Sequence, residues 1–323
     1  MRAELGLSNR EGEYGKGGSV SRTDGHGEEQ DQDMAQRNPR QIPVGSVALA
    51  FLGTSIAWRD GFFSLRYAVL GFIGLVLWHI SIQVLNDYFD YRSGVDLKTQ
   101  RTPFSGGSGV LPAHLLKPRS VLKFALVCFA LAVPIWTYFV IAKGLLLLPL
   151  VGLGAVCVLL YTPVLTRWRL AEISSGIGLG ILPILMSYFI QTGEYTTEAV
   201  VASIPCGILL FNVHLLNEFP DVEADKVGKR KTIPIVLGRV KASWIYLAGA
   251  LTVYVWVVAW VAVGVMPLTA LLSIVTIPLA LWTTRGALSY KDKVIFTPIL
   301  WANSLCLIFT LALLASGYLL SQY

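Results

Sequence analysis

Nine apolar runs, each about the length of a membrane-spanning helix, occupy most of the chain after residue 40. A helix rises about 1.5 Å per residue, so about 20 apolar residues cross the hydrocarbon core of a bilayer. Backbone groups in lipid must be satisfied within the segment, which favours helices. The sequence therefore predicts an all-α polytopic membrane protein with nine transmembrane helices, at about 41–58, 67–87, 120–141, 144–162, 171–191, 198–216, 243–264, 266–284 and 294–317.

The composition agrees with this fold class. Of the 323 residues, 54% are hydrophobic and only 14% are charged, which is more apolar surface than a soluble fold can cover. The net charge of +6 at pH 7 does not indicate nucleic-acid binding, because the Lys and Arg residues lie in short loops between the apolar runs. All four cysteines lie inside apolar runs without a pairwise motif, so we expect core residues and no disulfide or metal set: Cys128, Cys157, Cys206 and Cys306.

The segment before the first run has a different character. Residues 1–37 are rich in Gly, Ser, Glu, Gln, Asp and Arg and lack an apolar stretch. We therefore expect a disordered tail at 1–37, followed by a transmembrane domain at 38–323. The tail has no apolar core of a secretory signal. Translation from Met1 and translation from Met34 both remain open.

The basic loops predict an orientation. Sixteen Lys and Arg residues lie in the loops after the second, fourth, sixth and eighth runs, whereas the opposite loops carry only Arg59, Arg66 and Lys143. Short loops rich in Lys and Arg stay on the cytoplasmic side of a membrane. We therefore expect the N-terminus in the cytoplasm and the C-terminus on the opposite side.

Two apolar runs end in acidic clusters. The first cluster spans residues 86–96 and the second spans residues 217–225, at the ends of the second and sixth runs. Ionisable side chains inside or at the ends of membrane helices are functional candidates by default. Acidic residues at helix ends are also ordinary solvated surface, so one cluster alone is weak evidence. Two clusters on the same predicted side of the membrane, each followed by basic residues, favour a binding site.

Each cluster holds a pair of oxygen-bearing side chains at helical spacing. Asn86 and Asp90 are four residues apart, as are Asp221 and Asp225, so each pair lies on one helix face. Oxygen ligands suit Mg²⁺, which keeps several waters and bridges carboxylates to substrate phosphates. We predict that the clusters face one another and bind Mg²⁺ around a diphosphate, with ligands drawn from Asn86, Asp87, Asp90, Asp96, Asn217, Asp221 and Asp225.

Basic residues near both clusters are suited to the same diphosphate. They are Lys98 and Arg101 after the first cluster, Lys229 and Arg230 after the second, and Arg167 between the two. Their charges would stabilise a departing pyrophosphate, so that a carbocation develops on the carbon it leaves. Taken alone, these residues are better explained as topology signals.

Other polar features carry two interpretations each. His79 and His214 lie inside the second and sixth runs, where a hydrogen bond to a neighbouring helix is a better explanation than catalysis. The segment Gly106–Gly109 is either a lid over the site or a turn-rich loop.

At these residues the chain resembles the UbiA superfamily of intramembrane prenyltransferases. The first motif of that superfamily, approximately NDxxDxxxD, is matched from Asn86 to Asp90. The second, approximately DxxxD with a GKRT-like segment after it, is matched at Asp221–Asp225 and Gly228–Thr232. The resemblance covers about residues 38–317. It implies nine helices around a central cavity, Mg²⁺ as cofactor, and transfer of a polyprenyl group from its diphosphate to an acceptor, commonly an aromatic ring.

The spacing within the first motif indicates a branch of the superfamily. Its third acid is Asp96, six residues after Asp90 rather than four, so Asp96 reaches the metal only if Ser93 and Gly94 break the helix. This longer form, followed by the Gly-rich Gly106–Leu111, is most similar to the branch containing 1,4-dihydroxy-2-naphthoate polyprenyltransferases.

The resemblance also implies roles for individual residues. Asp90 and Asp221 are the expected catalytic carboxylates. Tyr161 and Arg167 match a loop that lies near the diphosphate in the family, so Arg167 is an expected catalytic contact to phosphate. The sequence identifies no general base for the acceptor hydroxyl.

The expected partners are a polyprenyl diphosphate, an aromatic acceptor and membrane lipid, with no nucleic acid and no obligatory protein partner evident. One alternative is a UbiA-type enzyme with a homogentisate, 4-hydroxybenzoate or glyceryl-lipid acceptor. An alternative from another class is a cation-coupled secondary transporter, in which paired acids bind the cation near mid-membrane. Acids at the ends of the runs, beside basic loops suited to phosphate, favour the enzyme.

Overall fold

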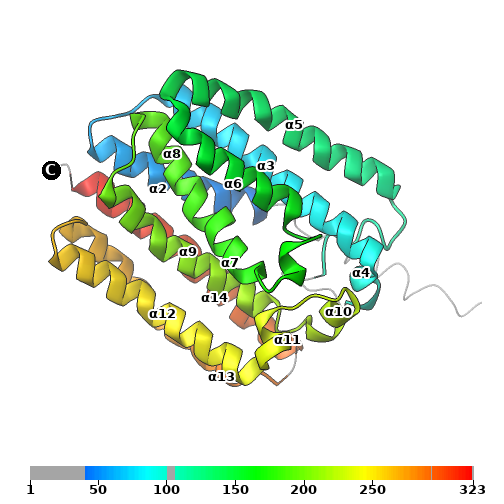
Figure 1. The fold of residues 1–323 in the computed structure, drawn as a ribbon. Coiled ribbons are helices and arrows are strands. Elements are labelled where there is room, and N and C mark those ends of the chain that lie inside the picture. Colours follow the sequence, from blue (N-terminus) through cyan, green and yellow to red (C-terminus); the bar gives the residue numbers. More distant parts are fainter. Residues whose placement is uncertain (1–40, 100–105, 292, 322–323) are drawn as a thin grey trace, which may run out of the picture. The chain divides into compact units, whose positions relative to one another are not determined.

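Helices account for all the regular secondary structure in the residues that the structure describes (Figure 1). The computed structural model describes residues 41–99, 106–291 and 293–321. The tail expected at 1–37, with Met34, and the predicted phosphate ligand Arg101 lie outside these residues, so the predictions about them stay predictions.

The helices follow the apolar runs closely. In chain order they are α2 (Gln41–Arg59), α3 (Leu65–Ser93), α4 (Val95–Lys98), α5 (Pro118–Lys143), η1 (Leu145–Leu147), α6 (Leu148–Leu160), η2 (Leu165–Arg167), α7 (Ala171–Ser175), η3 (Gly176–Ile181), α8 (Leu182–Thr192), α9 (Thr197–Asn217), α10 (Val222–Val227), α11 (Ile233–Leu237), α12 (Arg239–Ala262), η4 (Leu268–Thr276), α13 (Ile277–Leu288) and α14 (Lys293–Leu320).

Seven helical segments of the described chain are long and apolar enough to cross a membrane: Leu65–Ser93, Pro118–Lys143, Ala171–Thr192, Thr197–Asn217, Arg239–Ala262, Leu268–Leu288 and Phe296–Leu320. The run at 144–162 forms a shorter apolar helix, Leu145–Leu160, and the run at 41–58 forms α2, which is not among the seven. The all-α, multi-pass architecture is confirmed, and the count of nine spanning helices stays a prediction.

Capping residues set the length of α3, which carries the first acidic cluster. The side chain of Ser64 accepts a hydrogen bond from the Tyr67 backbone N–H at the N-terminal end of this helix. Gly94 ends it in the left-handed conformation, with φ 83°. Asn86 and Asp90 therefore share one helical face, and the break at Gly94 places Asp96 on the separate short helix α4.

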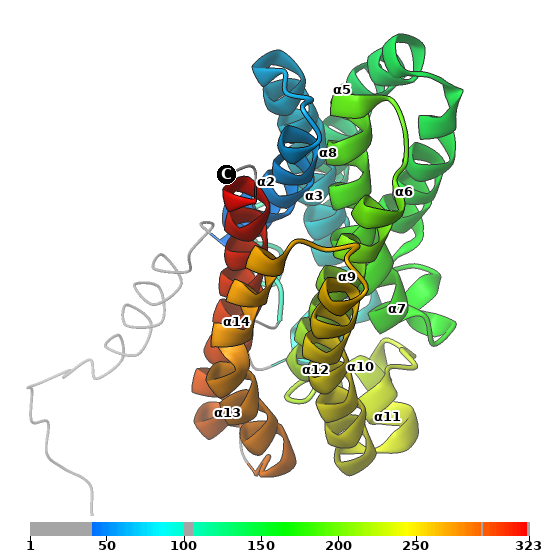
Figure 2. The same ribbon diagram turned by 90° about the vertical axis from the view of Figure 1, so that its left-hand side faces the viewer.

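Packing brings together helices that are distant in sequence. The first and last long helices of the described chain, α2 and α14, lie against each other (Figure 2), and α3 packs on α5. One buried apolar cluster joins α3, α5, α6 and α8 around Trp136, and another joins α2, α8, α9, α12 and α14 around Tyr188. The four cysteines are buried, as expected of core residues.

The contact between α9 and the segment α7–η3 depends on glycine. A Cβ on Gly180 would lie 2.7 Å from the Cα of Gly207, and a Cβ on Gly176 would lie 2.7 Å from the Gly207 carbonyl oxygen. The two backbones touch only because these side chains are absent. This contact holds the end of α7 and the segment η3 close to α9.

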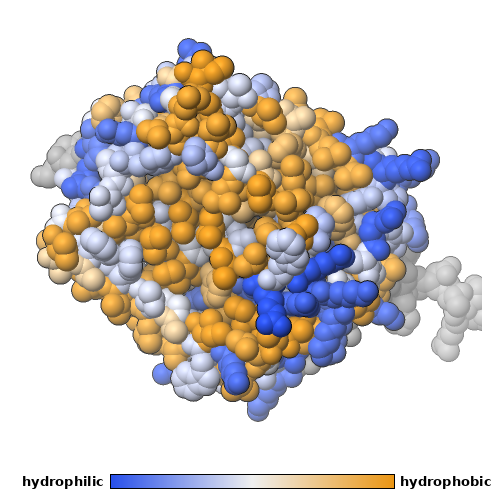
Figure 3. Space-filling model, in the orientation of Figure 1, coloured by the Kyte–Doolittle hydropathy of each residue, from blue (hydrophilic) through white to orange (hydrophobic). Residues whose placement is uncertain are grey.

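The surface separates apolar from charged regions. Figure 3 shows a broad hydrophobic face over the long helices and hydrophilic side chains gathered where α4, α10 and α11 lie. Many large apolar side chains on the long helices are exposed, among them Phe124, Leu131 and Val255. An apolar surface of this kind suits lipid contact.

Candidate active site

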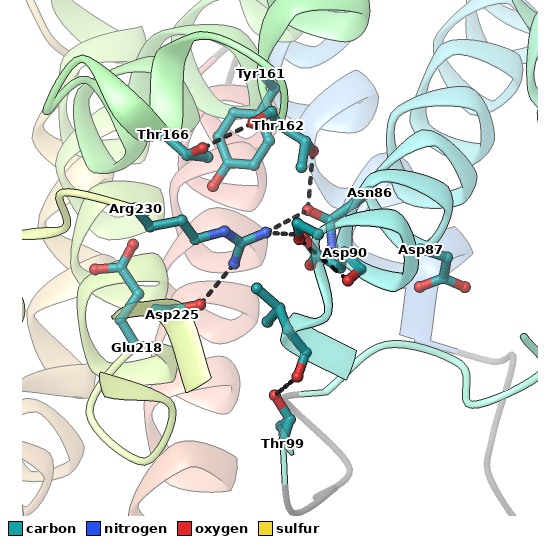
Figure 4. Close-up of polar contacts among 12 residues, drawn as sticks. Asn86, Asp87, Asp90, Thr99, Tyr161, Thr162, Thr166, Glu218, Asp225 and Arg230 are labelled. Atoms are coloured by element: carbon teal, nitrogen blue, oxygen red, sulfur yellow. Dashed lines mark hydrogen bonds and ion pairs between the residues drawn. The ribbon is translucent and has the colours of Figure 1, made fainter. Parts of the chain in front are cut away.

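The two acidic clusters meet at a single arginine (Figure 4). Arg230 pairs with Oδ1 of Asp90 in α3, and its Nη1 donates to Oδ1 of Asp225 in α10 at 2.9 Å. Its Nη2 also lies 3.4 Å from Oδ1 of Asn86. The structure therefore brings Asn86, Asp90 and Asp225 together with Arg230.

This ion-pair cluster is buried. The exposed fractions of the side chains are 6% for Asp90, 2% for Asp225 and 15% for Arg230. Removing one partner from such a group leaves an uncompensated charge, which costs about 3–5 kcal/mol. The guanidinium therefore compensates part of the negative charge of both carboxylates.

Backbone contacts hold Arg230 in place. The N–H of Arg230 donates to the Asp225 carbonyl at 3.1 Å, which folds the chain back after α10. The next residue, Lys231, donates its N–H to the Thr166 carbonyl at 2.9 Å and so joins this turn to η2.

Hydrogen bonds also orient the amide of Asn86. Its Nδ2 donates to Oδ2 of Asp90 at 2.9 Å, and its Oδ1 accepts from the Thr162 hydroxyl at 3.0 Å. The amide oxygen is thereby turned toward Arg230.

Burial perturbs the ionisation of the cluster. It raises the pKa of Asp225 to about 6, although Arg230 acts in the opposite direction. For Arg230, burial lowers the pKa, but Asp90 and Asp225 outweigh it and raise the pKa above its ordinary value. Burial and the neighbouring Glu172 raise the pKa of Glu218 well above its usual range. Full ionisation of these carboxyls therefore depends on cations beside them.

The remaining acids of the first cluster face the Gly-rich loop. The Ser108 N–H donates to Oδ1 of Asp87 at 3.2 Å. A Cβ on Gly107 would lie 2.8 Å from Oδ1 of Asp87 and 3.2 Å from both carboxylate oxygens of Asp96. Figure 4 shows Asp87 on the side of α3 away from Arg230. Asp87 and Asp96 thus lie on a second side of the motif, covered by this loop.

The second cluster adds two residues close to the first. Asp221 is half-buried and directly precedes α10, and its carbonyl accepts from the Asp225 N–H at 2.8 Å. Asn217 ends α9, and its buried Oδ1 has no hydrogen-bond partner in the described part of the chain. A buried amide oxygen of this kind is available to a cation.

Most of the predicted phosphate ligands lie outside the buried cluster. Lys98, Arg167 and Lys229 are exposed, and Arg101 lies outside the described residues. Tyr161 is buried, and its hydroxyl is hydrogen-bonded to Nε2 of His214. The bond from His214 to the end of α6, like the 2.7 Å bond from His79 to Ser46 in α2, confirms that both histidines contact neighbouring segments.

Sequence reasoning assigned no role to Thr162, Glu172 or Glu218. Glu172 and Glu218 are 1% and 6% exposed, and Glu172 accepts a hydrogen bond from the Ile233 N–H. Glu172 stands at the start of an apolar run, so the criterion that identified the two acidic clusters would also have found it.

The residues present fit Mg²⁺. Every candidate ligand is an oxygen, and the carboxylates of Asp90 and Asp225 both face one guanidinium. Within the described ranges, no group of three or more His, Cys, Asp or Glu side chains forms a complete metal site. Mg²⁺ tolerates such a partial set, because waters and substrate phosphates supply its other ligands.

A cavity of about 440 Å³ lies elsewhere, along one face of α12 beside Trp256 and Trp260. It does not reach the ion-pair cluster. The central cavity implied by the family resemblance therefore stays a prediction.

Comparison with known proteins gives consistent matches. The profile of the UbiA prenyltransferase family matches residues 46–295. The 1,4-dihydroxy-2-naphthoate octaprenyltransferase of Bacillus subtilis is 30% identical over 68% of this chain and 71% of its own length. The enzyme of the same name from Escherichia coli is 24% identical over 88% and 94%.

Solved structures share the fold. A UbiA homologue from Aeropyrum pernix superposes with a TM-score of 0.63 at 16% identity and covers 87% of this chain and 98% of its own. A homologue from Archaeoglobus fulgidus, solved with DMAPP and Mg²⁺, has a TM-score of 0.56 at 18% identity and covers 86% and 98%.

Proposed function

The chain belongs to the UbiA prenyltransferase family, and from this membership we propose that it transfers a polyprenyl group from a polyprenyl diphosphate to an aromatic acceptor with Mg²⁺ as cofactor. The acceptor we propose is 1,4-dihydroxy-2-naphthoate, in menaquinone-type quinone biosynthesis. Two relatives named for that substrate support this choice, and each alignment covers more than two thirds of this chain and of the relative.

The convergence of Asp90 and Asp225 on Arg230 carries the proposal. It joins motifs that are far apart in sequence around a position suited to one cation. The Archaeoglobus fulgidus homologue was solved with DMAPP and Mg²⁺, which supports the proposal that a metal and a prenyl diphosphate bind near Arg230 in this protein.

Asn86, Asp90, Asn217, Asp221 and Asp225 would hold Mg²⁺ at the buried end of the motifs. Asp87 and Asp96 would hold it on the side covered by the Gly-rich loop. The metal supplies positive charge that stabilises the pyrophosphate leaving group.

Arg230 would turn from the carboxylates toward the phosphate oxygens once these arrive, because a planar guanidinium matches phosphate geometry. Lys98, Arg101, Arg167 and Lys229 would neutralise phosphate charge from the aqueous side. Asp90 and Asp225 are little exposed, and a reaction centre shielded from water in the same way would protect a carbocation until the acceptor ring attacks it.

The other acceptors of UbiA-type enzymes remain the main alternative, since homogentisate, 4-hydroxybenzoate and glyceryl lipids use the same donor chemistry. A cation-coupled transporter is a weaker alternative. Its paired acids belong near the middle of the membrane, whereas Asp90 and Asp225 lie at helix ends beside exposed Lys and Arg residues.

The direct test is turnover by the protein purified in detergent. Geranyl, farnesyl and longer prenyl diphosphates are supplied with Mg²⁺ and each candidate acceptor, and pyrophosphate and prenylated product are measured. We expect product with 1,4-dihydroxy-2-naphthoate and none after chelation of Mg²⁺. Failure with every acceptor would refute the enzyme proposal.

Two substitutions test the metal ligands. Asp90→Asn and Asp225→Asn should each lower turnover about 100-fold or more, because each removes a charge that holds the metal at the reaction centre. Asp60→Asn is the matched control, since Asp60 accepts a hydrogen bond from Tyr188 far from this cluster. Full activity in either cluster variant would contradict the assignment.

A further inference from the structure

His214 lies beside the ion-pair cluster and is held by its neighbours. Its Nε2 is hydrogen-bonded to the Tyr161 hydroxyl and lies 3.6 Å from Oε1 of Glu218. The rings of Tyr161 and His214 meet edge to face, with centroids 5.5 Å apart. Two oxygens on one side therefore fix the position of the imidazole.

The other ring nitrogen is open. The side chain of His214 is 29% exposed, whereas that of Glu218 is 7% exposed. Its Nδ1 makes no hydrogen bond to any described residue, in contrast to Nδ1 of His79, which is bonded to Ser46 at 2.7 Å. His214 thus has one anchored ring nitrogen and one that makes no hydrogen bond to the described residues.

The tautomer follows from these contacts. Tyr161 and Glu218 place oxygen atoms near Nε2, so a proton on Nε2 has an acceptor and the lone pair is left on Nδ1. The positively charged group that acts on His214 is Arg230. Tyr161 after α6 and Glu218 after α9 contact this ring, and the other acidic groups that act on these two residues are Asp90 in α3, Glu172 in α7 and Asp225 in α10.

From this geometry we propose that His214 is the general base that takes the hydroxyl proton of the aromatic acceptor, with Tyr161 as its positioning residue. This assignment rests on the proposed function. The acceptor O–H bond breaks and its proton moves to Nδ1. The carbon–oxygen bond to the diphosphate breaks, and pyrophosphate leaves with that electron pair. The deprotonated ring then forms a carbon–carbon bond to the prenyl carbocation, and it regains aromaticity when the attacked carbon loses its other substituent, which is a proton or, where the carbon bears a carboxylate, carbon dioxide. The bound pyrophosphate, Tyr161 and Glu218 stabilise the imidazolium that results.

A role in packing alone is the competing explanation, since the bond to Tyr161 also ties α9 to the end of α6. The two roles differ in their dependence on the acceptor. A base matters most when the acceptor hydroxyl is weakly acidic, whereas a packing defect slows every acceptor equally.

The test compares His214→Gln with His79→Gln, a matched change at a histidine that bonds Ser46 away from the cluster. Turnover is measured in the full-length protein with geranyl diphosphate, Mg²⁺ and a series of dihydroxynaphthalenes of increasing hydroxyl acidity. Binding of a non-reactive geranyl thiodiphosphate is measured alongside. We expect His214→Gln to lower kcat about 100-fold or more with the least acidic acceptor and much less with the most acidic, while affinity for the thiodiphosphate is unchanged. His79→Gln should leave the acidity dependence of kcat as it is in the unsubstituted protein.

Tyr161→Phe gives a second readout, because it keeps the ring and removes the anchor of Nε2. A smaller loss of kcat with the same dependence on acceptor acidity supports the assignment. If His214→Gln loses the same fraction of kcat with every acceptor, or keeps full activity, the assignment of His214 as the base is overturned. Turnover by the unsubstituted protein would still uphold the proposed function in that case. No turnover by the unsubstituted protein would overturn both.

Discussion

Arg230 places one positive charge between two buried carboxylates, Asp90 and Asp225. A guanidinium satisfies both geometrically but leaves the group with a net negative charge. Mg²⁺ carries two charges and prefers the same oxygens. Arg230 is therefore well suited to hold the two motifs together when no metal is present, and to pair with phosphate when the metal is bound.

Substitution of Arg230 tests this idea. Arg230→Met should lower the thermal stability of the metal-free protein, because two buried carboxylates lose their partner at a cost of about 3–5 kcal/mol. Mg²⁺ alone should restore much of the melting temperature, since it replaces the missing charge. Arg239→Met is the control, because Arg239 bonds the Phe219 carbonyl and stacks on Tyr290. If Mg²⁺ fails to raise the melting temperature of Arg230→Met, the idea that the guanidinium and Mg²⁺ compensate the same two carboxylates is wrong.

Gly107 tests whether the Gly-rich loop acts on Asp87 and Asp96. A side chain at Gly107 would be strained by its φ of +64° and would press on both carboxylates. Gly107→Ala should therefore lower turnover several-fold and raise the Mg²⁺ concentration needed for half-maximal turnover. Gly61→Ala is the matched control, with φ +87° but nothing within 4 Å of the added Cβ, and it should affect stability by about 1–2 kcal/mol and not turnover. Equal turnover in the two variants would indicate that the Gly-rich loop is a turn without an effect on Asp87 and Asp96.

Helical spacing made part of this site predictable. Asn86 and Asp90 lie on one face of α3 because four residues are about one turn. Placing Asp225 near them required one further assumption, that the two acidic clusters face each other. Glu172 was overlooked although it stands at the start of an apolar run. Its closeness to Glu218, which is distant in sequence, results from packing and could not be read from the sequence. Arg167 was expected at the diphosphate from the resemblance, yet it is exposed on η2, and its role stays a prediction.

At the scale of elements, apolar runs identified the helices well, because lipid leaves the backbone few alternatives. Their internal irregularities were harder to foresee. The run at 171–191 contains the π-helical segment η3, rich in glycine and pressed against Gly207 of α9. That close approach depends on the partner helix, which a single run of sequence does not reveal.

The glycine contact predicts a large effect from one methyl group. Gly180→Ala places a Cβ 2.7 Å from the Gly207 Cα, so α9 and η3 must separate, at a cost of about 1–3 kcal/mol. We expect a lower melting temperature and lower turnover, because the separation also moves α7 and Glu172 away from α9. Gly152→Ala in α6 meets nothing within 4 Å and should be neutral or slightly stabilising in the same measurements. Similar behaviour of the two variants would contradict the packing argument.

At the scale of the whole molecule, the two ends of the long helices differ in chemistry. The acidic clusters and Arg230 lie at one end. The other end carries a smaller polar group in which Arg59 pairs with Glu198 and stacks on Tyr318. That group links α2, α9 and α14 and suits a structural role. The excess of Lys and Arg near the acidic clusters predicts that this end faces the cytoplasm.

Cysteine labelling measures that orientation. Glu194 lies in the turn before α9 and Lys226 lies in α10 after it, so the two exposed positions are separated by one membrane-spanning helix. The native cysteines are buried and should react little with a membrane-impermeant maleimide. In intact cells we expect labelling of Glu194→Cys and none of Lys226→Cys, which should react only after the membrane is opened. The reverse pattern would place the basic loops outside and contradict the predicted orientation. The expected pattern would put Asp90, Asp225 and Arg230 at the cytoplasmic side of the membrane, so that the soluble pyrophosphate product is released into the cytoplasm.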